Sequence, residues 1–247
     1  MKVFIESTGD NGASLTCFLP QITDEIPTSK KRSAILVIPG GAYYNCSDRE
    51  GEPVALAFAA KGYSAFVLKY SVGEGNADFP RPLNEAEKAL ELIYDNAEEW
   101  GVDKSRVAAI GFSAGGHLCA ALSTMGRVKP AASILGYPCI LENDKTNCRI
   151  ATEMIPLDRE VTGETPPTFL FGCCEDTCVQ IVNSLAYINA LNKAGVPFEV
   201  HIFQKGYHGF SLADSTVYST QAEIDYTAHL AVWFDMCITW LDQIFNK

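Results

Sequence analysis

Residues 106–125, RVAAIGFSAGGHLCAALSTM, join an apolar run to a helical pattern through a serine flanked by glycines. The run over 106–110 is typical of a strand covered on both faces, and apolar residues recur at helical spacing from Ala114 onward. A serine on such a sharp turn takes a strained backbone conformation, and glycines two residues on either side let neighbouring elements approach without a Cβ clash. The stretch therefore predicts a nucleophile elbow that lifts the Ser113 hydroxyl out of a sheet.

A plainer interpretation of the same turn is that Ser113 only caps the following helix. A cap alone does not require glycine on both sides, so we favour the elbow. An elbow also requires a histidine, a carboxylate and an oxyanion hole, in a defined order along the chain.

Composition limits the class of protein. The 247 residues, 47% of them apolar, suit one α/β domain with a large core, and no linker-like stretch divides them. A net charge of −11 repels nucleic acid and anionic membrane surfaces, and no apolar run approaches the length of a membrane span. Nine cysteines, with no apolar segment of signal-peptide length at the N-terminus, predict reduced thiols and a cytoplasmic location. The oligomeric state stays open, a homo-oligomer included.

The remaining apolar runs predict eight strands. The first two form an antiparallel hairpin at the sheet edge, because a turn rich in glycine, aspartate and asparagine separates them. The later strands alternate with helices, which predicts a mostly parallel sheet covered on both faces. Residues 138–165 are polar and poorly patterned, and we expect a small cap insertion there. The expected strands are 3–7, 14–19, 34–38, 64–70, 106–110, 132–137, 168–171 and 198–203, and the expected helices 52–61, 83–100, 114–125, 181–194 and 221–245.

A glycine pair, Gly40-Gly41, follows the expected strand 34–38. At the carboxyl end of a central strand, such a pair exposes backbone amides where ligands bind in α/β sheets. A simple flexible turn is the alternative, and the neighbouring elbow favours an oxyanion hole. We expect the amides of Gly41, Ala42 and Ala114 to hold the negative oxygen of a tetrahedral intermediate.

One of the four histidines, His208, falls in a loop just past the last expected strand, where an imidazole can reach the elbow serine. The carboxylate that orients this imidazole is expected on the loop after the preceding strand. Asp176 fits this position, and Glu175 is a rival of the same chemical type. The resulting order of serine, acid and histidine is the one expected of the α/β-hydrolase fold.

Five motifs are shared with a known group of enzymes: Pro39-Gly40-Gly41-Ala42-Tyr43, Ser47-Asp48-Arg49-Glu50-Gly51-Glu52-Pro53, Gly111-Phe112-Ser113-Ala114-Gly115-Gly116-His117, Asp176 with Val179 and Asn183-Ser184, and Gly206-Tyr207-His208-Gly209. Along nearly its whole length the chain resembles α/β-hydrolase serine esterases, especially the small carbohydrate acetyl esterases related to acetyl-xylan esterase and BD-FAE-type hydrolases. The resemblance implies a triad of Ser113, Asp176 and His208 and hydrolysis of short acyl esters, often acetyl groups on sugars. Two positions depart from the pattern: Ala42 stands where the group usually has glycine, and Gln180 where it commonly has proline.

The implied reaction passes through an acyl-enzyme and needs no cofactor or metal. Its partner is a small-molecule ester, for instance an acetylated sugar. Tyr43, Tyr44, Asn45 and Arg49 leave the oxyanion turn, and we expect them to line a pocket for the alcohol. The alternative is that the tyrosines are ordinary half-buried loop residues.

Three alternatives to an esterase make different demands on the chain. A peptidase is the nearest enzymatic rival, because the same fold and triad cleave amides. A hydrolase-fold protein that binds a small ligand without turnover would be expected to lack a triad member. A metal site at Cys173, Cys174 and Cys178 is disfavoured, because adjacent cysteines do not easily face one ion and the spacing of paired zinc-binding cysteines is absent.

Overall fold

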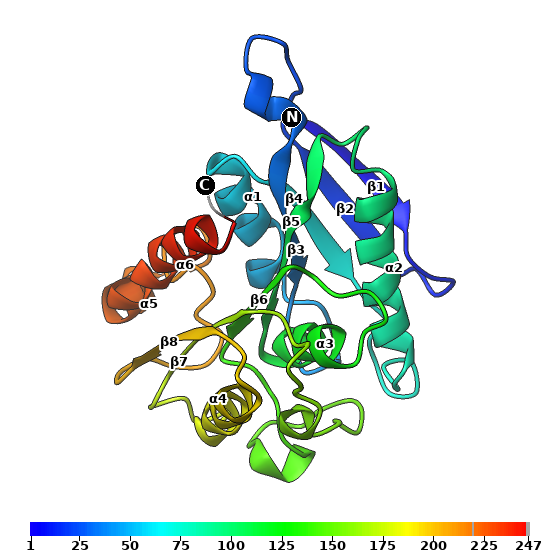
Figure 1. Ribbon diagram of the computed structural model, residues 1–247. Helices are drawn as coiled ribbons and strands as arrows, with labels where there is room; N and C mark the ends of the chain where they lie inside the picture. Colours follow the sequence, from blue (N-terminus) through cyan, green and yellow to red (C-terminus); the bar gives the residue numbers. More distant parts are fainter. Residues whose placement is uncertain (219, 246–247) are drawn as a thin grey trace.

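The computed structural model describes residues 1–218 and 220–245. Within these residues, eight strands form one sheet in the order β1-β2-β4-β3-β5-β6-β7-β8 (Figure 1). The strands are β1 (Lys2–Ser7), β2 (Ser14–Leu19), β3 (Arg32–Ile38), β4 (Ser64–Lys69), β5 (Val102–Phe112), β6 (Ala132–Gly136), β7 (Thr168–Cys173) and β8 (Phe198–Phe203). The α-helices are α1 (Glu52–Ala60), α2 (Arg81–Asp95), α3 (Ser113–Thr124), α4 (Val182–Ala194), α5 (Gln221–Thr227) and α6 (Val232–Ile244).

The sheet is parallel from β4 to β8 and antiparallel at one edge. β1 pairs with β2 and β2 with β4 in antiparallel fashion, whereas the pairs among the other strands are parallel. The predicted edge hairpin and mostly parallel eight-stranded sheet are therefore confirmed, and the hairpin makes the sheet mixed. Because parallel strands end at one edge, the loops after β3, β5, β7 and β8 open on the same side.

Helices cover both faces of the sheet. Helices α2, α3 and α4 lie on one side, and α1, α5 and α6 on the other (Figure 1). Two buried clusters follow from this arrangement, one holding Leu36 and Leu118 and the other Ile35 and Trp233. Adjacent residues of β3 enter opposite clusters because successive strand side chains point to opposite faces.

The C-terminal region differs from the single helix expected over 221–245. It is divided into α5, a 3-10 turn η5 (Ala228–Leu230) and α6. The break lets Leu230 and Trp233 bury together, and the Trp233 indole stacks on Phe171 with ring centroids 4.1 Å apart. Periodicity alone does not reveal such a break, because both halves keep helical spacing.

The segment between β6 and β7 lies on the side where the parallel strands end. It contains two 3-10 turns, η3 (Asn143–Lys145) and η4 (Leu157–Arg159). The Ala151 amide donates to the Ala42 carbonyl over 3.0 Å, so the segment lies against the glycine-rich turn after β3. The helices of the described residues are too short or too polar to span a lipid bilayer.

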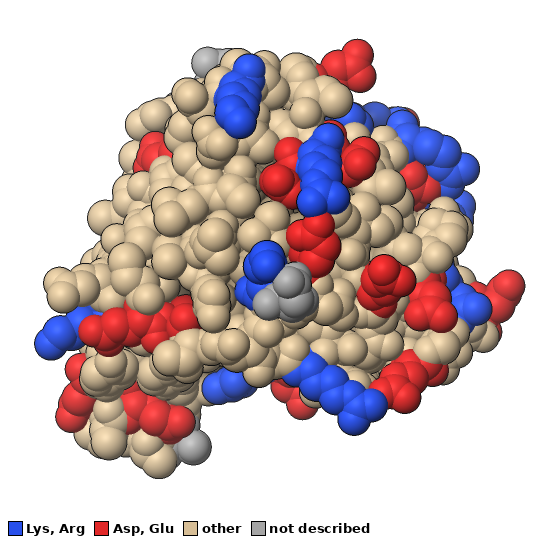
Figure 2. All heavy atoms as spheres, turned by 90° about the horizontal axis from the view of Figure 1, so that it is seen from below, with Lys and Arg blue, Asp and Glu red and all other residues tan. Residues whose placement is uncertain are grey.

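Acidic and basic side chains are interspersed among uncharged ones on the face seen in Figure 2. Several cations are paired across the surface: Arg149 lies 2.6 Å from Glu74, and Arg159 lies 2.5 Å from Glu142. Exposed pairs of this kind contribute little stability, and their effect is to balance charge locally on a chain whose net charge is −11.

Candidate active site

Ser113 stands where β5 ends and α3 begins. Its φ is +53°, in the left-handed region that residues with a side chain rarely adopt. Both flanking glycines are required by close approaches: a Cβ on Gly111 would lie 2.1 Å from the Gly115 carbonyl oxygen, and one on Gly115 would lie 2.2 Å from the Ile38 carbonyl oxygen. The strained turn predicted for the elbow is therefore present, together with the reason for its glycines.

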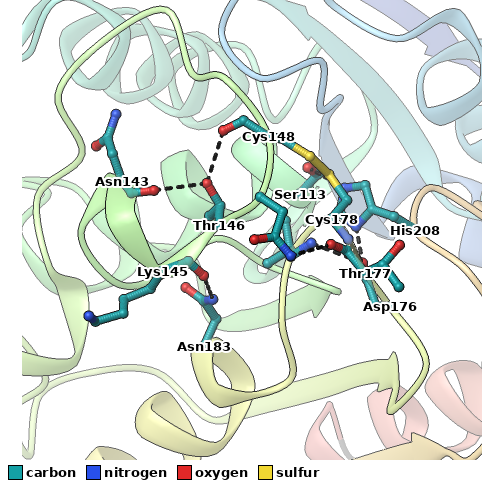
Figure 3. Close-up of a disulfide and its surroundings, with 12 residues drawn as sticks. Ser113, Asn143, Lys145, Thr146, Cys148, Asp176, Thr177, Cys178, Asn183 and His208 are labelled. Atoms are coloured by element: carbon teal, nitrogen blue, oxygen red, sulfur yellow. Dashed lines mark hydrogen bonds and ion pairs between the residues drawn. A yellow bond between two sulfur atoms is a disulfide. The ribbon is translucent and has the colours of Figure 1, made fainter.

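His208 and Asp176 approach Ser113 from two other loops (Figure 3). The Ser113 hydroxyl lies 2.7 Å from His208 Nε2, and His208 Nδ1 lies 2.7 Å from Asp176 Oδ2. A carboxylate accepts hydrogen bonds, so the Nδ1–H donates to Asp176 and Nε2 accepts from the serine hydroxyl. This tautomer leaves the histidine able to take the serine proton.

Asp176, not Glu175, faces the imidazole. Asp176 is 5% exposed, and its Oδ1 accepts from the amides of Cys178 and Val179, each over 2.9 Å. Glu175 is exposed, and its Oε2 accepts from the Tyr226 hydroxyl over 3.1 Å. Two amide donors fix the Asp176 carboxylate and leave its other oxygen for the histidine.

The turn after β3 carries three consecutive residues in the left-handed region. Gly41, Ala42 and Tyr43 have φ values of +123°, +53° and +59°. A Cβ on Gly41 would lie 2.2 Å from the Asn45 carbonyl oxygen, so this position requires glycine. Ala42 adopts its φ despite a Cβ, at a cost of about 1–2 kcal/mol.

Three amides near Ser113 have no hydrogen-bond acceptor within the described residues. Within the part of the chain that the structure describes, the Gly41 and Ala42 amides donate to no other group. Ala114 is the second residue of α3, where an amide has no intrahelical acceptor. Gly41, Ala42 and Ser113 line the same pocket, so these amides are available to an oxygen bound beside the serine.

A pocket of about 440 Å³ opens at Ser113. Its lining comes from the segment after β3, from Cys148 and Ile150, from Cys178 and Val179, and from the loop of His208. A broader groove of about 1050 Å³ adjoins it and shares Tyr44, Asn45 and Ser47 with it. The pocket is lined by Gly41, Ala42, Tyr44, Asn45, Ser47, Arg49, Glu50, Ser113, Cys148, Ile150, Cys178, Val179, His208 and Gly209. Three of the four residues expected beside an alcohol are thus at the pocket, and sequence reasoning missed Glu50, Ile150 and the two cysteines.

Tyr43, the fourth residue expected there, lies elsewhere. Its side chain is fully buried, and its hydroxyl lies 2.8 Å from His117 Nδ1. His117 Nε2 lies 2.9 Å from the Ile155 carbonyl oxygen, so Nε2–H donates there and Nδ1 accepts from Tyr43. Burial lowers the pKa of His117 to about 4, so the ring is neutral near pH 7. Tyr43 and His117 therefore tie the glycine-rich turn to α3 and to the segment after β6.

Cys148 and Cys178 form a disulfide beside the triad, with Cα atoms 5.5 Å apart (Figure 3). The expectation of reduced thiols is wrong for this pair, and no sequence signal marked two loop cysteines 30 residues apart as partners. The bond joins the segment after β6 to the loop that carries Asp176. With Cys178 so bonded, it is not a free ligand beside Cys173 and Cys174, and the described residues contain no cluster of three or more His, Cys, Asp or Glu suited to a metal ion.

Comparison with known proteins identifies the family. Residues 22–133 match the BD-FAE family, and residues 140–238 match the prolyl oligopeptidase family. The crystal structure of MGS-M1, an α/β-hydrolase enzyme from a Medee basin deep-sea metagenome library, is 40% identical, with a TM-score of 0.93 over 100% of this chain and 99% of its own. The chain belongs to the α/β-hydrolase family. The resemblance and the fold class drawn from the motifs are confirmed.

Other similar proteins carry esterase or ester-hydrolase names. An acetylxylan esterase of Xylanibacter ruminicola is 29% identical over an alignment of 242 residues that covers 89% of this chain and 48% of that protein. The crystal structure of an acetyl ester-xyloside bifunctional hydrolase from Caldicellulosiruptor lactoaceticus is 30% identical, with a TM-score of 0.77 over 95% of this chain and 96% of its own. The present chain spans less than half of the length of the first curated relatives that it matches, 34% and 48%.

Proposed function

We propose that this α/β hydrolase is a serine carboxylesterase that releases short acyl groups, acetyl above all, from small esters. We further propose acetylated sugars, such as acetylated xylo-oligosaccharides, as the substrate class. The observation that carries the proposal is the hydrogen-bonded series Ser113, His208 and Asp176 at an open pocket. The acetyl and sugar specificity is supported by the names of two similar proteins, the acetylxylan esterase and the acetyl ester-xyloside hydrolase.

Acylation begins when the Ser113 oxygen attacks the ester carbonyl and His208 Nε2 takes the hydroxyl proton. Asp176 stabilises the resulting imidazolium through the Nδ1–H bond. The carbonyl oxygen becomes an oxyanion, which the three free amides near Ser113 are suited to hold. His208 then protonates the leaving alcohol as the ester C–O bond breaks, and the acyl group stays on the serine.

Deacylation repeats these steps with water. His208 takes a proton from water, whose oxygen attacks the acyl carbonyl and forms a second oxyanion. Collapse of this intermediate breaks the bond to Ser113, and His208 returns the proton to the serine oxygen. The carboxylic acid is released and the starting protonation states are restored.

The two connected hollows suggest how a substrate is divided. We propose that the acyl group occupies the pocket of about 440 Å³ and that the alcohol extends past Tyr44 and Asn45 into the adjoining groove. Arg49 offers a guanidinium group, and the exposed Tyr44 offers an aromatic face and a hydroxyl; both suit a sugar ring. In this proposal the 247 residues make one domain, with residues 138–165 as a small cap over the acyl side.

The first experiment compares hydrolysis of p-nitrophenyl acetate, butyrate and octanoate, with Ser113→Ala prepared identically as the control. A preference for acetate that disappears in the variant supports the proposal and leads to acetate release from acetylated xylo-oligosaccharides. Turnover no higher than that of the variant contradicts it. Peptide p-nitroanilides form a further arm, because the match of residues 140–238 to the prolyl oligopeptidase family favours a peptidase as the second candidate.

A further inference from the structure

Glu50 is a buried acid for which the reaction above has no use. It lies in the 3-10 turn η2 (Asp48–Glu50), is 3% exposed, and borders the pocket that holds Ser113. A carboxylate so buried needs strong partners, since its removal from water is costly. Its partners come from segments far apart in the sequence.

One oxygen of Glu50 holds the turn after β3. The Gly40 amide donates to Glu50 Oε2 over 2.9 Å, one residue before the proposed oxyanion amides begin. The packing is tight: a Cβ on Gly40 would lie 2.8 Å from this oxygen and 2.9 Å from Ser113 Cβ. The carboxylate, the turn and the elbow serine therefore meet with no room for another atom.

The other oxygen of Glu50 reaches the loop of His208 through Tyr137. The Tyr137 hydroxyl donates to Glu50 Oε1 over 2.7 Å and accepts from the Ser211 amide over 3.0 Å. The Tyr137 ring, 2% exposed, stands edge-on to the His208 ring with centroids 5.0 Å apart. A second bond closes the link, because the Ser211 hydroxyl donates to the Arg49 carbonyl over 2.6 Å.

Electrostatics add to this geometry. Burial raises the pKa of Glu50 above its ordinary value, while the hydrogen bonds from Tyr137 and Gly40 act in the opposite direction. An ionised Glu50 would favour the imidazolium that forms on His208 during the proposed reaction. Its hydrogen bonds lead to the same groups, the turn after β3 and the loop of His208, which act in the transition state of the proposed reaction.

We propose that Glu50 is a positioning residue of the esterase: its carboxylate holds the oxyanion turn through Gly40 and, through Tyr137, the loop that carries His208. The inference rests on the proposed function, and it assigns a task to a residue that lies outside the triad. A residue that aligns transition-state groups should affect kcat more than KM.

The test uses Glu50→Gln, Tyr137→Phe and the double variant, with Glu87→Gln as the matched control. Glu87 is 2% exposed and bonded to Arg127, but it lies on α2 and does not line the pocket. In Glu50→Gln the side-chain oxygen of the glutamine can still accept the hydrogen bond from the Gly40 amide. Its NH2 group, however, faces the Tyr137 hydroxyl, which already accepts a hydrogen bond from the Ser211 amide. We expect kcat on p-nitrophenyl acetate to fall about 10- to 100-fold, less than for loss of an oxyanion donor itself, with KM within about twofold.

Tyr137→Phe removes the link to the histidine loop and should lower kcat about fivefold or more. The double variant should lose less than the product of the two single losses, because both changes break the same bond. Thermal melting followed by circular dichroism measures the folded fraction of each variant. Glu87→Gln should lose stability and keep its kcat. If Glu50→Gln does not fold, Tyr137→Phe decides the matter in the same assay.

A kcat within twofold of the wild type in Glu50→Gln, a change in KM alone, or an equal loss of kcat in Glu87→Gln would overturn the inference. Failure of the proposed function is recognised separately, as absence of turnover in the wild-type chain. The rate at which an alkyl fluorophosphonate labels Ser113 then replaces turnover as the readout, since labelling needs the same turn and histidine. We expect Glu50→Gln to slow it at least tenfold, and an unchanged rate refutes the positioning role.

Discussion

Asp176→Asn separates the geometry of the acid from its charge. Asp176 Oδ1 accepts hydrogen bonds from the backbone amides of Cys178 and Val179, each over 2.9 Å. The oxygen of asparagine must take that position, which puts its NH2 group 2.7 Å from His208 Nδ1. A donor there forces Nδ1 to accept, and the ring proton moves to Nε2. The serine then faces a proton where it needs a lone pair, although the fold is unchanged.

The size of the effect follows from the bonds involved. If the asparagine side chain flips to restore an acceptor for His208, its NH2 group faces the amides of Cys178 and Val179. Both amides then lose their acceptor, which costs about 2 kcal/mol or more. Even then, the charge-assisted bond that stabilises the imidazolium is lost, worth about 2–3 kcal/mol. Together these terms raise the barrier by about 4–5 kcal/mol, which corresponds to a loss of about 10³- to 10⁴-fold in kcat.

The assay is kcat and KM on p-nitrophenyl acetate, with Glu175→Gln as the matched control. Glu175 is exposed and bonded to Tyr226, so its variant should stay within about twofold of the wild type. Retention of more than a tenth of the wild-type kcat by Asp176→Asn would refute the reasoning. So would an equal loss in the two variants.

Four further changes have defined outcomes. Gly41→Ala should lower kcat at least about 100-fold, because the new Cβ would lie 2.2 Å from the Asn45 carbonyl oxygen. Ala42→Gly should keep kcat and raise the free energy of unfolding, measured with urea, by up to about 1 kcal/mol, because glycine adopts the left-handed φ without strain. His117 has its pKa lowered from 6.5 to about 4, so the unfolded chain binds a proton more readily and stability falls as pH falls. Between pH 7 and 5 the wild type should lose about 2 kcal/mol more than His117→Gln, and equal losses would contradict the buried neutral ring. A reductant should lower the unfolding free energy by about 3.6 kcal/mol, because it opens the 30-residue loop closed by Cys148 and Cys178. A variant with serine at both positions should be unaffected.

The elbow and the edge hairpin of a mostly parallel sheet were predictable because their signals are local. An apolar run, a glycine-flanked serine and a helical pattern occupy adjacent residues over 106–125, and steric limits on the turn act within that stretch. His208 was found because its loop follows the last strand, and parallel strands all deliver their loops to one edge. Asp176 and Glu175 were not separable, because both are carboxylates on the same loop. The backbone amides that bond Asp176 are visible only in three dimensions.

Other features depend on contacts between distant segments. Tyr43 looked like a pocket residue because it follows the oxyanion turn, yet its left-handed φ of +59° accompanies a side chain that is buried against His117. The Cys148–Cys178 disulfide joins two loops whose proximity is set by the strands that carry them. The break after α5 depends on where Trp233 meets Phe171. In each case the deciding partner lies far away in the sequence.

The segment over 138–165 touches each part of the candidate site without contributing a triad side chain. At its start the Cys139 amide donates to the Ser113 carbonyl over 3.1 Å, which holds the elbow in a conformation that costs about 1–2 kcal/mol. Further along, Ala151 bonds the oxyanion turn, and Cys148 is bonded to the loop of the acid. Because serine, turn and acid all contact this one segment, a change in its packing would move them relative to one another. Its sequence is therefore expected to affect turnover as well as substrate size, even though its own pattern predicted no regular structure.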